Sequence, residues 1–505
     1  MVITWRQFSG RCEWCGQLLS FLTCSARWRL LIRYGLYLAA VVALGAYLCL
    51  AVFAKSPQNA QSLLGIFGIV FVCFVLSQKP SKVNWHPVFW GFAIQICFAA
   101  ITLQSEGGYK VFKWLGDCVI HLLSFSNVGS AFVLGANFAT MGLLFEFAGV
   151  MIFFGSLIGL LIHYGIIGFL VVKGGHILSL AMDTRPVESL IAVANIFIGM
   201  SQAPLLVLPY LPTMSRSELG AMMTCGFASV SGDALAVFIS YGAPANHMLI
   251  AAIISAPAAL AIAKLLMPET GEVGLTMEEN ISSDVIGRDK SQNALSAASD
   301  GALIAVRLVS SAMVNMLAFV SLLSLIDATL AFFGERAGIH GLTFDTICGY
   351  LLFPLAYGMG APYDDCSRVG SLIGLKLFAT PVASYIALGK LVNNRKVLEN
   401  YVNNGNGTWH WEGSDIILEA SNTTLIYGVV SQKAEAISTY AMCGFSAFTA
   451  IGITLGALTS LCPPRKSEII KLVIPAFLGG NMASFATGAV AGNYCTHLDS
   501  LDFKI

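Results

Sequence analysis

The sequence predicts an all-α polytopic membrane protein with about nine transmembrane spans and two re-entrant hairpins. Apolar residues make up 56% of the 505 positions, charged residues 11%, and the mean hydropathy is +0.75. A soluble domain carries about 25% charged residues. Proline and polar residues also interrupt two of the apolar segments, and membrane proteins tolerate such breaks where the backbone lines a cavity. The lipid bilayer is therefore the first expected partner.

Charge and cysteine content exclude other classes. With 28 basic and 28 acidic residues the formal net charge is zero, which argues against a nucleic-acid partner. The 13 cysteines are scattered and form no disulfide framework. Cys12-Glu-Trp-Cys15 has metal-ligand spacing but no second pair, so we interpret these residues as cytoplasmic thiols. No nucleophile–base pair is visible, and the sequence predicts neither an enzyme nor a bound organic cofactor.

The N-terminal region predicts an additional membrane anchor. An apolar run from Leu30 to Phe53 follows a segment with several arginines and has no small-residue cleavage site. The basic flank predicts a cytoplasmic N-terminus. Further spans are expected near 62–78, 85–103 and 148–172. The intervening stretch 104–147 mixes lysines with aromatic residues, so we expect it to be interfacial.

Two parts of the chain, 186–268 and 366–492, have the same organisation. Each contains a proline-broken segment, then Cys-Gly-Phe opening a small-residue helix, then a final span. The matching phrases are Cys225-Gly-Phe-Ala-Ser-Val-Ser-Gly232 and Cys443-Gly-Phe-Ser-Ala-Phe-Thr-Ala450. Broken segments at corresponding positions of two halves indicate a transporter site near the bilayer midplane. The alternative is a chance match, since membrane helices are rich in small and apolar residues.

The distribution of charge predicts the topology. The basic segment 463–471 reads as cytoplasmic, and so does 269–300, where the sequon at Asn280 would stay unmodified. The polar insert 393–432 would then lie outside, with Asn406 and Asn422 as candidate glycosylation sites. We expect a multi-pass plasma-membrane protein with an extracellular C-terminus.

We divide the chain into eight parts. The first four are an N-terminal region with the extra span (1–61), scaffold spans with interfacial helices (62–185), the first repeat (186–268) and a cytoplasmic loop with a long scaffold helix (269–348). The last four are a helix with the second hairpin (349–392), an extracellular loop (393–432), the broken helix and last span of the second repeat (433–492) and a tail (493–505).

On the basis of these sequence motifs, the chain resembles the concentrative nucleoside transporter family from about residue 63 to 492. Asn195-Ile-Phe-Ile-Gly-Met-Ser-Gln-Ala-Pro204 is similar to the family's first hairpin, and Gly349-Tyr-Leu-Leu-Phe-Pro-Leu-Ala-Tyr-Gly-Met-Gly-Ala-Pro362 and Ser438-Thr-Tyr-Ala-Met-Cys-Gly-Phe445 to its second half. The resemblance implies a homotrimer with a scaffold, including a long helix at 301–333, and a mobile transport domain that moves like an elevator. It implies coupling to sodium, with a proton as the alternative.

The resemblance also places the substrate site, where this chain departs from the family. The family's first tip reads Gly-Gln-Thr-Glu, and this chain has Gly199 followed by three other residues; the second tip has Pro381 in place of a carboxylate. The implied substrate-binding positions are Met200, Ser201, Gln202, Ala234, Thr380, Pro381, Phe445, Ala447 and Ala450. Leaving a buried polar group of a ligand unpaired costs about 1–3 kcal/mol. The loss of carboxylates therefore predicts a shifted substrate preference.

The implied sodium ligands are retained. Asn195 and Ser229 match the family's coordinating side chains, and Ile198 and Val230 match the residues that lend backbone carbonyls. Oxygen atoms of broken backbone suit a hard monovalent cation. The alternative is that Asn195 and Ser229 only satisfy broken backbone.

Asp233 is an addition that the resemblance does not supply. It lies in an otherwise apolar helix beside Ala234. A carboxylate at membrane depth usually faces a cavity and marks an ion or substrate path, so Asp233 could bind a hydroxyl group or carry a proton. The alternative is that it faces water or a structural partner. For Asp364 and Asp365 we favour a structural capping role.

Two hypotheses follow for function. The first is a sodium-coupled symporter of nucleosides or related small polar solutes. The second is a relative that does not transport, or has a shifted substrate, and acts as a receptor or assembly partner, because polar pocket residues are lost at both hairpins.

Overall fold

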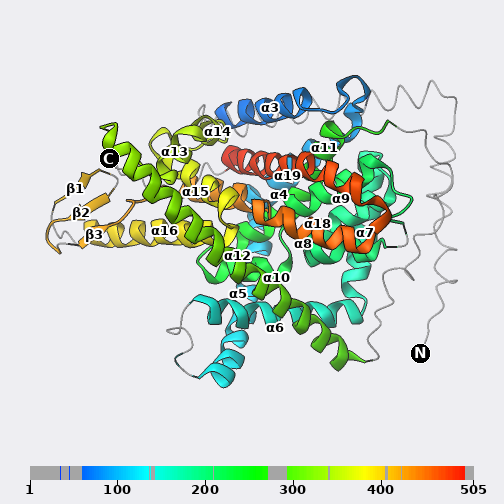
Figure 1. The fold of residues 1–505 in the computed structure, drawn as a ribbon, viewed down its shortest axis with the longest axis horizontal. Helices are drawn as coiled ribbons and strands as arrows, with labels where there is room; N and C mark the ends of the chain where they lie inside the picture. The colour runs from blue at the N-terminus through cyan, green and yellow to red at the C-terminus, as the bar shows by residue number, and fades with distance from the viewer. Residues whose placement is uncertain are drawn as a thin grey trace. The chain divides into compact units, whose positions relative to one another are not determined.

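The chain forms two compact units, residues 1–57 and 58–505, in a computed structural model. The first unit is described only at residues 35, 42 and 45, so the expected anchor span otherwise lies outside the described residues. The second unit is described at 60–135, 137, 143–208, 210–270, 293–338, 342–403, 408–413, 415–421 and 423–494. Everything that follows concerns this second unit, whose described part is almost entirely helical and confirms the all-α prediction (Figure 1).

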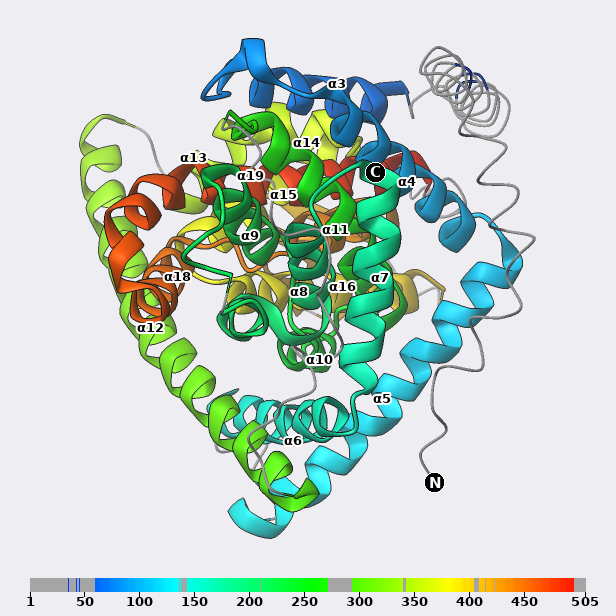
Figure 2. The same ribbon diagram turned by 90° about the vertical axis from the view of Figure 1, so that its right-hand side faces the viewer.

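A first group of helices precedes and flanks the repeats. It consists of α3 (Ala60–Val75), the short η4 (Pro80–Lys82), α4 (Trp85–Leu103), α5 (Glu106–Leu134), α6 (Leu143–His163), α7 (Ile166–Met182) and, later in the chain, α12 (Ala294–Arg336). The long α12 packs along α6, and α5 contacts α6 and α11. Figure 2 shows α5 and α12 as long helices on opposite sides of the central group. The long helix expected at 301–333 is thus present and extends beyond both expected ends.

Two details of this group differ from the prediction. The segment expected as a span at 148–172 is not one straight helix, because it runs through α6 into α7 and these two helices meet at an angle of 73°. Gly165 between them has φ 73°, a left-handed conformation that glycine adopts at little cost. Helix α5, expected to be interfacial, is 29 residues long and apolar enough to cross a membrane by length and composition.

The first repeat contains α8 (Pro186–Leu206), α9 (Arg216–Ala228), α10 (Gly232–Ser240) and α11 (Ala245–Leu266). Ser215 begins α9 with a capping box, in which its hydroxyl accepts from the Glu218 amide while the Glu218 carboxylate accepts from the Ser215 amide. Helix α9 then ends at Ala228, and α10 starts only after an extended segment at 229–231. The span after the first hairpin is therefore broken in the middle.

The second repeat follows α13 (Phe344–Leu351), α14 (Phe353–Gly358) and η6 (Tyr363–Asp365). Its hairpin is formed by α15 (Cys366–Phe378) and α16 (Pro381–Asn403). The broken helix consists of α17 (Gln432–Met442) and α18 (Phe448–Leu461), and η7 (Pro463–Arg465) leads into α19 (Lys466–Tyr494). Helix α19 packs against both α9 and α17, so it holds the two broken helices together.

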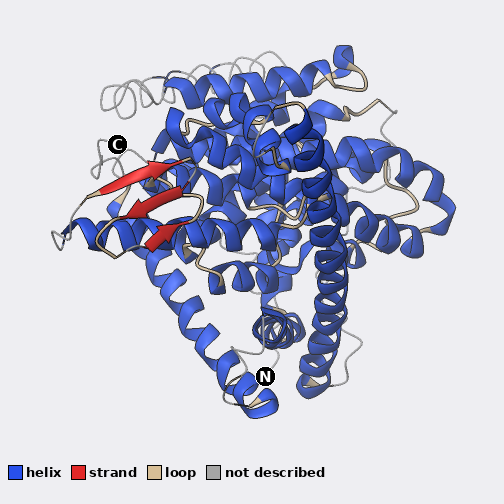
Figure 3. Cartoon of the chain, turned by 60° about the vertical axis from the view of Figure 1, so that its left-hand side comes forward, coloured by secondary structure: helices blue, strands red, loops and turns tan. Residues whose placement is uncertain are grey.

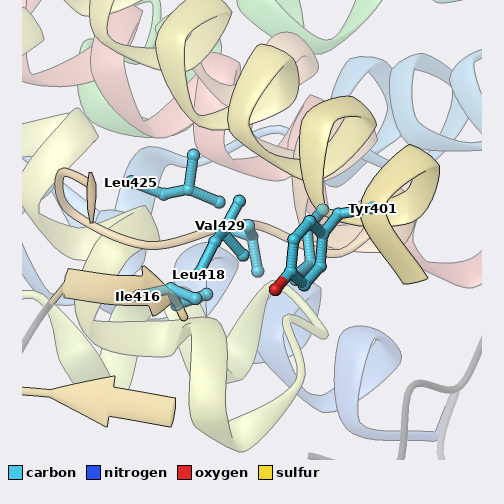
Figure 4. Packing of buried hydrophobic residues seen from close by; sticks show 6 residues of the cluster. Tyr401, Ile416, Leu418, Leu425 and Val429 are labelled. Atoms are coloured by element: carbon cyan, nitrogen blue, oxygen red, sulfur yellow. The ribbon is translucent and has the colours of Figure 1, made fainter. Parts of the chain in front are cut away.

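The insert between α16 and α17 contains a small antiparallel sheet. Strands β1 (Trp409–Glu412), β2 (Asp415–Leu418) and β3 (Thr423–Leu425) form it in the order β1-β2-β3 (Figure 3). Trp409 pairs with Leu418, and Ile416 pairs with Leu425. Its inner face forms a cluster with the end of α16 (Figure 4), consisting of Leu398, Tyr401, Ile416, Leu418, Leu425 and Val429. The segment expected as a loop at 393–432 thus has its own core. The sequons Asn406 and Asn422 lie outside the described residues, as does Asn280.

Within the described part of the chain, five helices are long and apolar enough to cross a membrane, or six if the bent pair α6–α7 counts as one span. Two of the five are largely buried. The span formed by α9 together with α10, and the span formed by α11, each have 89% of their most apolar 18-residue stretch buried inside the protein. The first of these buried spans, α9 with α10, carries the predicted site residues Ser229, Val230, Asp233 and Ala234.

Candidate functional site

The first hairpin turns at Gly199. This residue lies inside α8 with φ 70° and ψ 173°, values outside the helical region. A Cβ atom on Gly199 would lie 2.6 Å from the Cβ of Ser231, which belongs to the break between α9 and α10. The tip of the hairpin therefore touches the broken helix so closely that only glycine fits there.

Asn195, one of the predicted cation ligands, lies in α8 four residues before this contact. Asn195 is only 1% exposed, and its Nδ2 donates to the Ile191 carbonyl oxygen at 3.0 Å. Its Oδ1 has no hydrogen-bond partner among the described residues. A Cβ atom on Gly226 of α9 would lie 3.8 Å from this oxygen, so Oδ1 faces the last turn of α9. A buried, unpaired amide oxygen is costly unless a cation or water meets it.

The end of α9 supplies further oxygen atoms. Ser229 is the C-cap of α9, and its hydroxyl donates to the Cys225 carbonyl at 2.7 Å. The hydroxyl oxygen keeps lone pairs free for a second interaction. Ile198 and Val230, on the two segments that break, are buried as well, at 5% and 0% exposure. The Asn195 amide oxygen and the Ser229 hydroxyl are neutral oxygens at the end of a broken helix, the kind of ligand that suits a monovalent cation.

The second hairpin has a different tip. Helix α15 ends at Phe378, and the Thr380 hydroxyl accepts from the Ala383 amide at 3.2 Å, which caps the start of α16. Pro381 is the first residue of α16, where a proline loses no helical hydrogen bond. The residue that stands at the expected carboxylate position therefore serves to start a helix.

A cavity of about 90 Å³ lies between the first hairpin and the scaffold helices. Gln202 of α8 and Asp233 of α10 line it from one side, and Asp300 of α12 lines it from the other. Asp233 is 3% exposed, and its Oδ1 accepts from the Ala234 amide at 2.9 Å. The structure thus brings Asp233 and Gln202 into one cavity, and Phe445 is not among the described residues that line it.

The other predicted substrate residues lie around the two breaks. Met200 accepts a hydrogen bond from Thr454 of α18 through its sulfur, at 3.6 Å. Ala234, Ala447 and Ala450 are buried apolar positions. The Phe445 backbone amide joins the two breaks by donating to the Ser229 carbonyl. The side chain of Ser201 lies outside the described residues.

Sequence reasoning missed the anchor of the first hairpin. At its base, Lys264 of α11 forms an ion pair with Glu188 of α8 at 2.6 Å, and both side chains are buried. The second hairpin has a related anchor, where an Asp365 carboxylate oxygen accepts from the Ser431 amide at the start of α17. Asp365 is the N-cap residue of α15, but its side chain makes no capping hydrogen bond there, so the cap expected on the hairpin is not seen and the carboxylate ties the hairpin to α17 instead. For Lys264 the signal was a lone lysine within an apolar helix.

Two helix hairpins, two interrupted helices and a helical scaffold define a secondary-transporter fold. The sequence matches three family descriptions in succession: the Na+ dependent nucleoside transporter N-terminus over residues 64–137, a nucleoside recognition "Gate" over 144–245, and the Na+ dependent nucleoside transporter C-terminus over 247–492. The chain belongs to the Na+-dependent nucleoside transporter family.

Similar curated proteins support this assignment. The sodium/nucleoside cotransporter 2 of Rattus norvegicus is 36% identical over 469 residues, which cover 93% of this chain and 67% of that protein. The sodium/nucleoside cotransporter 1 of Homo sapiens is 34% identical, covering 94% of this chain and 70% of its own length. The solute carrier family 28 member 3 of Mus musculus is 34% identical, with 62% of its length covered. The chain thus spans about two thirds of the length of these relatives.

Solved structures show the same fold. The structure of CNTnw in an inward-facing substrate-bound state superposes with a TM-score of 0.74 at 27% identity, covering 86% of this chain and 98% of that one. A CNTnw variant in an outward-facing state gives a TM-score of 0.75 at 26% identity, covering 88% and 99%. An all-α membrane transporter is therefore the correct fold class.

Proposed function

We propose that this protein is a sodium-coupled symporter of nucleosides or related small polar solutes in the plasma membrane. The observation that carries the proposal is the buried, unpaired Oδ1 of Asn195, which faces the end of α9. Sodium bound there by Asn195, Ser229 and the nearby backbone carbonyls would pair this oxygen and favour the closed contact between the hairpin tip and the broken helix. Family membership supports sodium as the coupling ion.

The cargo would be recognised differently from the family pattern. Met200 and Pro381 offer no charge at the two tips, and Gln202 and Asp233 are polar residues that share one largely apolar cavity. A solute with hydroxyl or amino groups would find its acceptors in that pair. We further propose an elevator movement of the hairpins and broken helices against α6 and α12, within a homotrimer with a cytoplasmic N-terminus and an extracellular C-terminus. The cavity between α10 and these scaffold helices lies along that path.

Uptake of radiolabelled uridine, adenosine and free bases into cells that express the protein tests the proposal, with sodium replaced by choline as the comparison. We expect uptake only in sodium, and an at least tenfold loss in Asn195→Leu, because a charge-assisted contact is worth about 1.5–3 kcal/mol. Asn84→Ala, at the exposed N-cap of α4, is the matched control. Surface expression without uptake of any of these solutes would contradict the proposal.

The loss of polar residues at both tips favours a second candidate, a receptor or assembly partner that does not transport. A thermal-shift measurement separates the two. Saturable stabilisation by a nucleoside that requires sodium supports the symporter, whereas unchanged thermal stability over the same range of solutes supports the second candidate.

A further inference from the structure

Lys376 is a lysine buried inside the second hairpin. Its side chain in α15 is 0% exposed and ranks among the largest fully buried side chains of the protein. Nζ donates to the Ala441 carbonyl oxygen at 3.1 Å and lies 5.6 Å from the centre of the Phe485 ring. Lys376 forms no ion pair within the described part of the chain. Burying an ammonium group without a carboxylate is expensive, so such a group needs a strong local reason.

The position of Lys376 corresponds to that of Asn195 in the first repeat. The two hairpins read Asn195-Ile-Phe-Ile-Gly199 and Lys376-Leu-Phe-Ala-Thr380. Both stretches place a phenylalanine two residues before the break, at Gly199 and at Thr380. The shared Cys-Gly-Phe phrases pair α9 with α17 in the same way. Asn195 and Lys376 are thus equivalent residues of the two repeats.

The partners of the two residues are equivalent as well. Asn195 Oδ1 faces the last turn of α9, and Lys376 Nζ donates to Ala441 in the last turn of α17. The C-terminal end of a helix carries a partial negative charge and unpaired carbonyls, which favour a cation. The first repeat offers neutral oxygens to a dissolved cation at this place, whereas the second carries a cation on its own side chain.

We infer that the ammonium group of Lys376 is a tethered cation that occupies, in the second repeat, the place that sodium takes in the first. The part of this inference that concerns the first repeat rests on the proposed binding of sodium there. It implies that one sodium ion is coupled at the breaks rather than two, and that the second hairpin stays closed on α17 without a dissolved ion. Lys376 is a positioning residue for the site, because it holds the tip of the second hairpin next to the broken helix.

The competing explanation is that Lys376 only fills space with its aliphatic chain. Methionine has a similar volume and no charge, so Lys376→Met separates the two. We expect the apparent Tm of the purified protein to fall by at least about 5 °C in both choline and sodium. Lys396→Met, on the exposed side of α16 in the same hairpin, is the matched control and should leave the Tm unchanged. A Lys376→Met protein within about 1 °C of wild type would overturn the inference.

Lys376→Asn gives the second repeat the side chain of the first. We expect it to be less stable than wild type in choline, and to regain more Tm from sodium than wild type gains, with a steeper sodium dependence of uptake. The wild-type response to sodium reports the proposed function, and the comparison of variants in choline reports the role of Lys376. An Asn variant that responds to sodium as wild type does contradicts the equivalence.

If Lys376→Met does not accumulate as folded protein, the reverse substitution in the first repeat tests the inference instead. Asn195→Lys places an ammonium group where the first repeat is proposed to bind sodium. A folded variant whose Tm in choline matches or exceeds that of wild type, and no longer rises with sodium, supports the inference. A variant that is less stable than wild type in both salts, or that still responds to sodium, overturns it.

Discussion

The backbone amide of Phe445 donates a hydrogen bond to the carbonyl oxygen of Ser229, with 3.2 Å between N and O. Ser229 is the C-cap of α9, and Phe445 lies in the break between α17 and α18. Each break frees backbone groups that lipid cannot satisfy. Here a carbonyl group freed by the break of the first repeat accepts from an amide group freed by the break of the second repeat. The two breaks therefore stabilise each other at the centre of the site.

Gly444→Ala should disrupt this contact between the two helix breaks. A Cβ atom at position 444 would lie 2.4 Å from the Ser484 hydroxyl oxygen and 3.1 Å from the Ala228 carbonyl oxygen. Because backbone surrounds it, the added methyl group should cost about 1–3 kcal/mol of folding free energy. The measurement is the apparent Tm of the purified protein. Gly452→Ala in α18 is the control, since open space surrounds that position and its stability should stay equal or rise.

The sequence predicted the breaks because local signals mark them. Gly199, the prolines after it and the repeated Cys-Gly-Phe phrases are visible without any structure, and helices do stop there. The bend at Gly165 was missed, although glycine is the usual residue for such a turn, because the segments on both sides of it are strongly apolar. Hydropathy alone does not distinguish one span from two helices that meet at an angle.

The contacts between distant segments were beyond sequence reasoning. Lys376 and Ala441 are far apart in the chain, and only the fold places them together. The same holds for Gln202 and Asp300, which face one cavity from different helices. The small sheet was missed for another reason. Its strands are short, and their alternation around Ile416 was outweighed by the polar character of the insert.

Asp233→Asn should reduce sodium-dependent uptake. The buried carboxylate of Asp233 supplies the charge on the side of the cavity formed by α8 and α10. A hydrogen bond to a charged group is worth about 1.5–3 kcal/mol, or about tenfold to a hundredfold in rate. Asp300→Asn, on the scaffold side of the same cavity and exposed, is the control and should change uptake by less than about threefold. Equal effects of the two variants would contradict a special role for Asp233.

Ile416→Ala should loosen the sheet that follows α16. Ile416 is 0% exposed and lies opposite Leu425 (Figure 4), so truncation leaves a cavity that costs about 2–5 kcal/mol. We expect limited proteolysis to cleave the insert faster than in wild type. Thr424→Ala, on the exposed side of β3, should be cut at the wild-type rate, and a variant of Ile416 as resistant as wild type would show that this core does not hold the sheet.

Lys264→Met should strongly destabilise the base of the first hairpin. Nζ lies 2.6 Å from a Glu188 carboxylate oxygen and donates to the Ser217 hydroxyl at 3.1 Å, and the two charged side chains are 9% and 1% exposed. Removing one member of a buried pair leaves an uncompensated charge, which costs about 3–5 kcal/mol. We expect a marked fall in apparent Tm and in sodium-dependent uptake, since α8 would lose its buried ion pair with α11.

A second substitution separates the cost of the stranded charge from the loss of packing. Lys264→Met combined with Glu188→Gln removes both charges while the amide oxygen at position 188 can still accept from the Arg185 amide, so the double variant should recover most of the lost Tm. Lys110→Met is the control at an exposed pair, where Glu106 lies 3.4 Å away and both side chains face outward, so its effect should stay below about 0.5 kcal/mol. If the double variant is no more stable than Lys264→Met alone, the hairpin depends on the ion pair itself, because removing the stranded charge has then restored nothing.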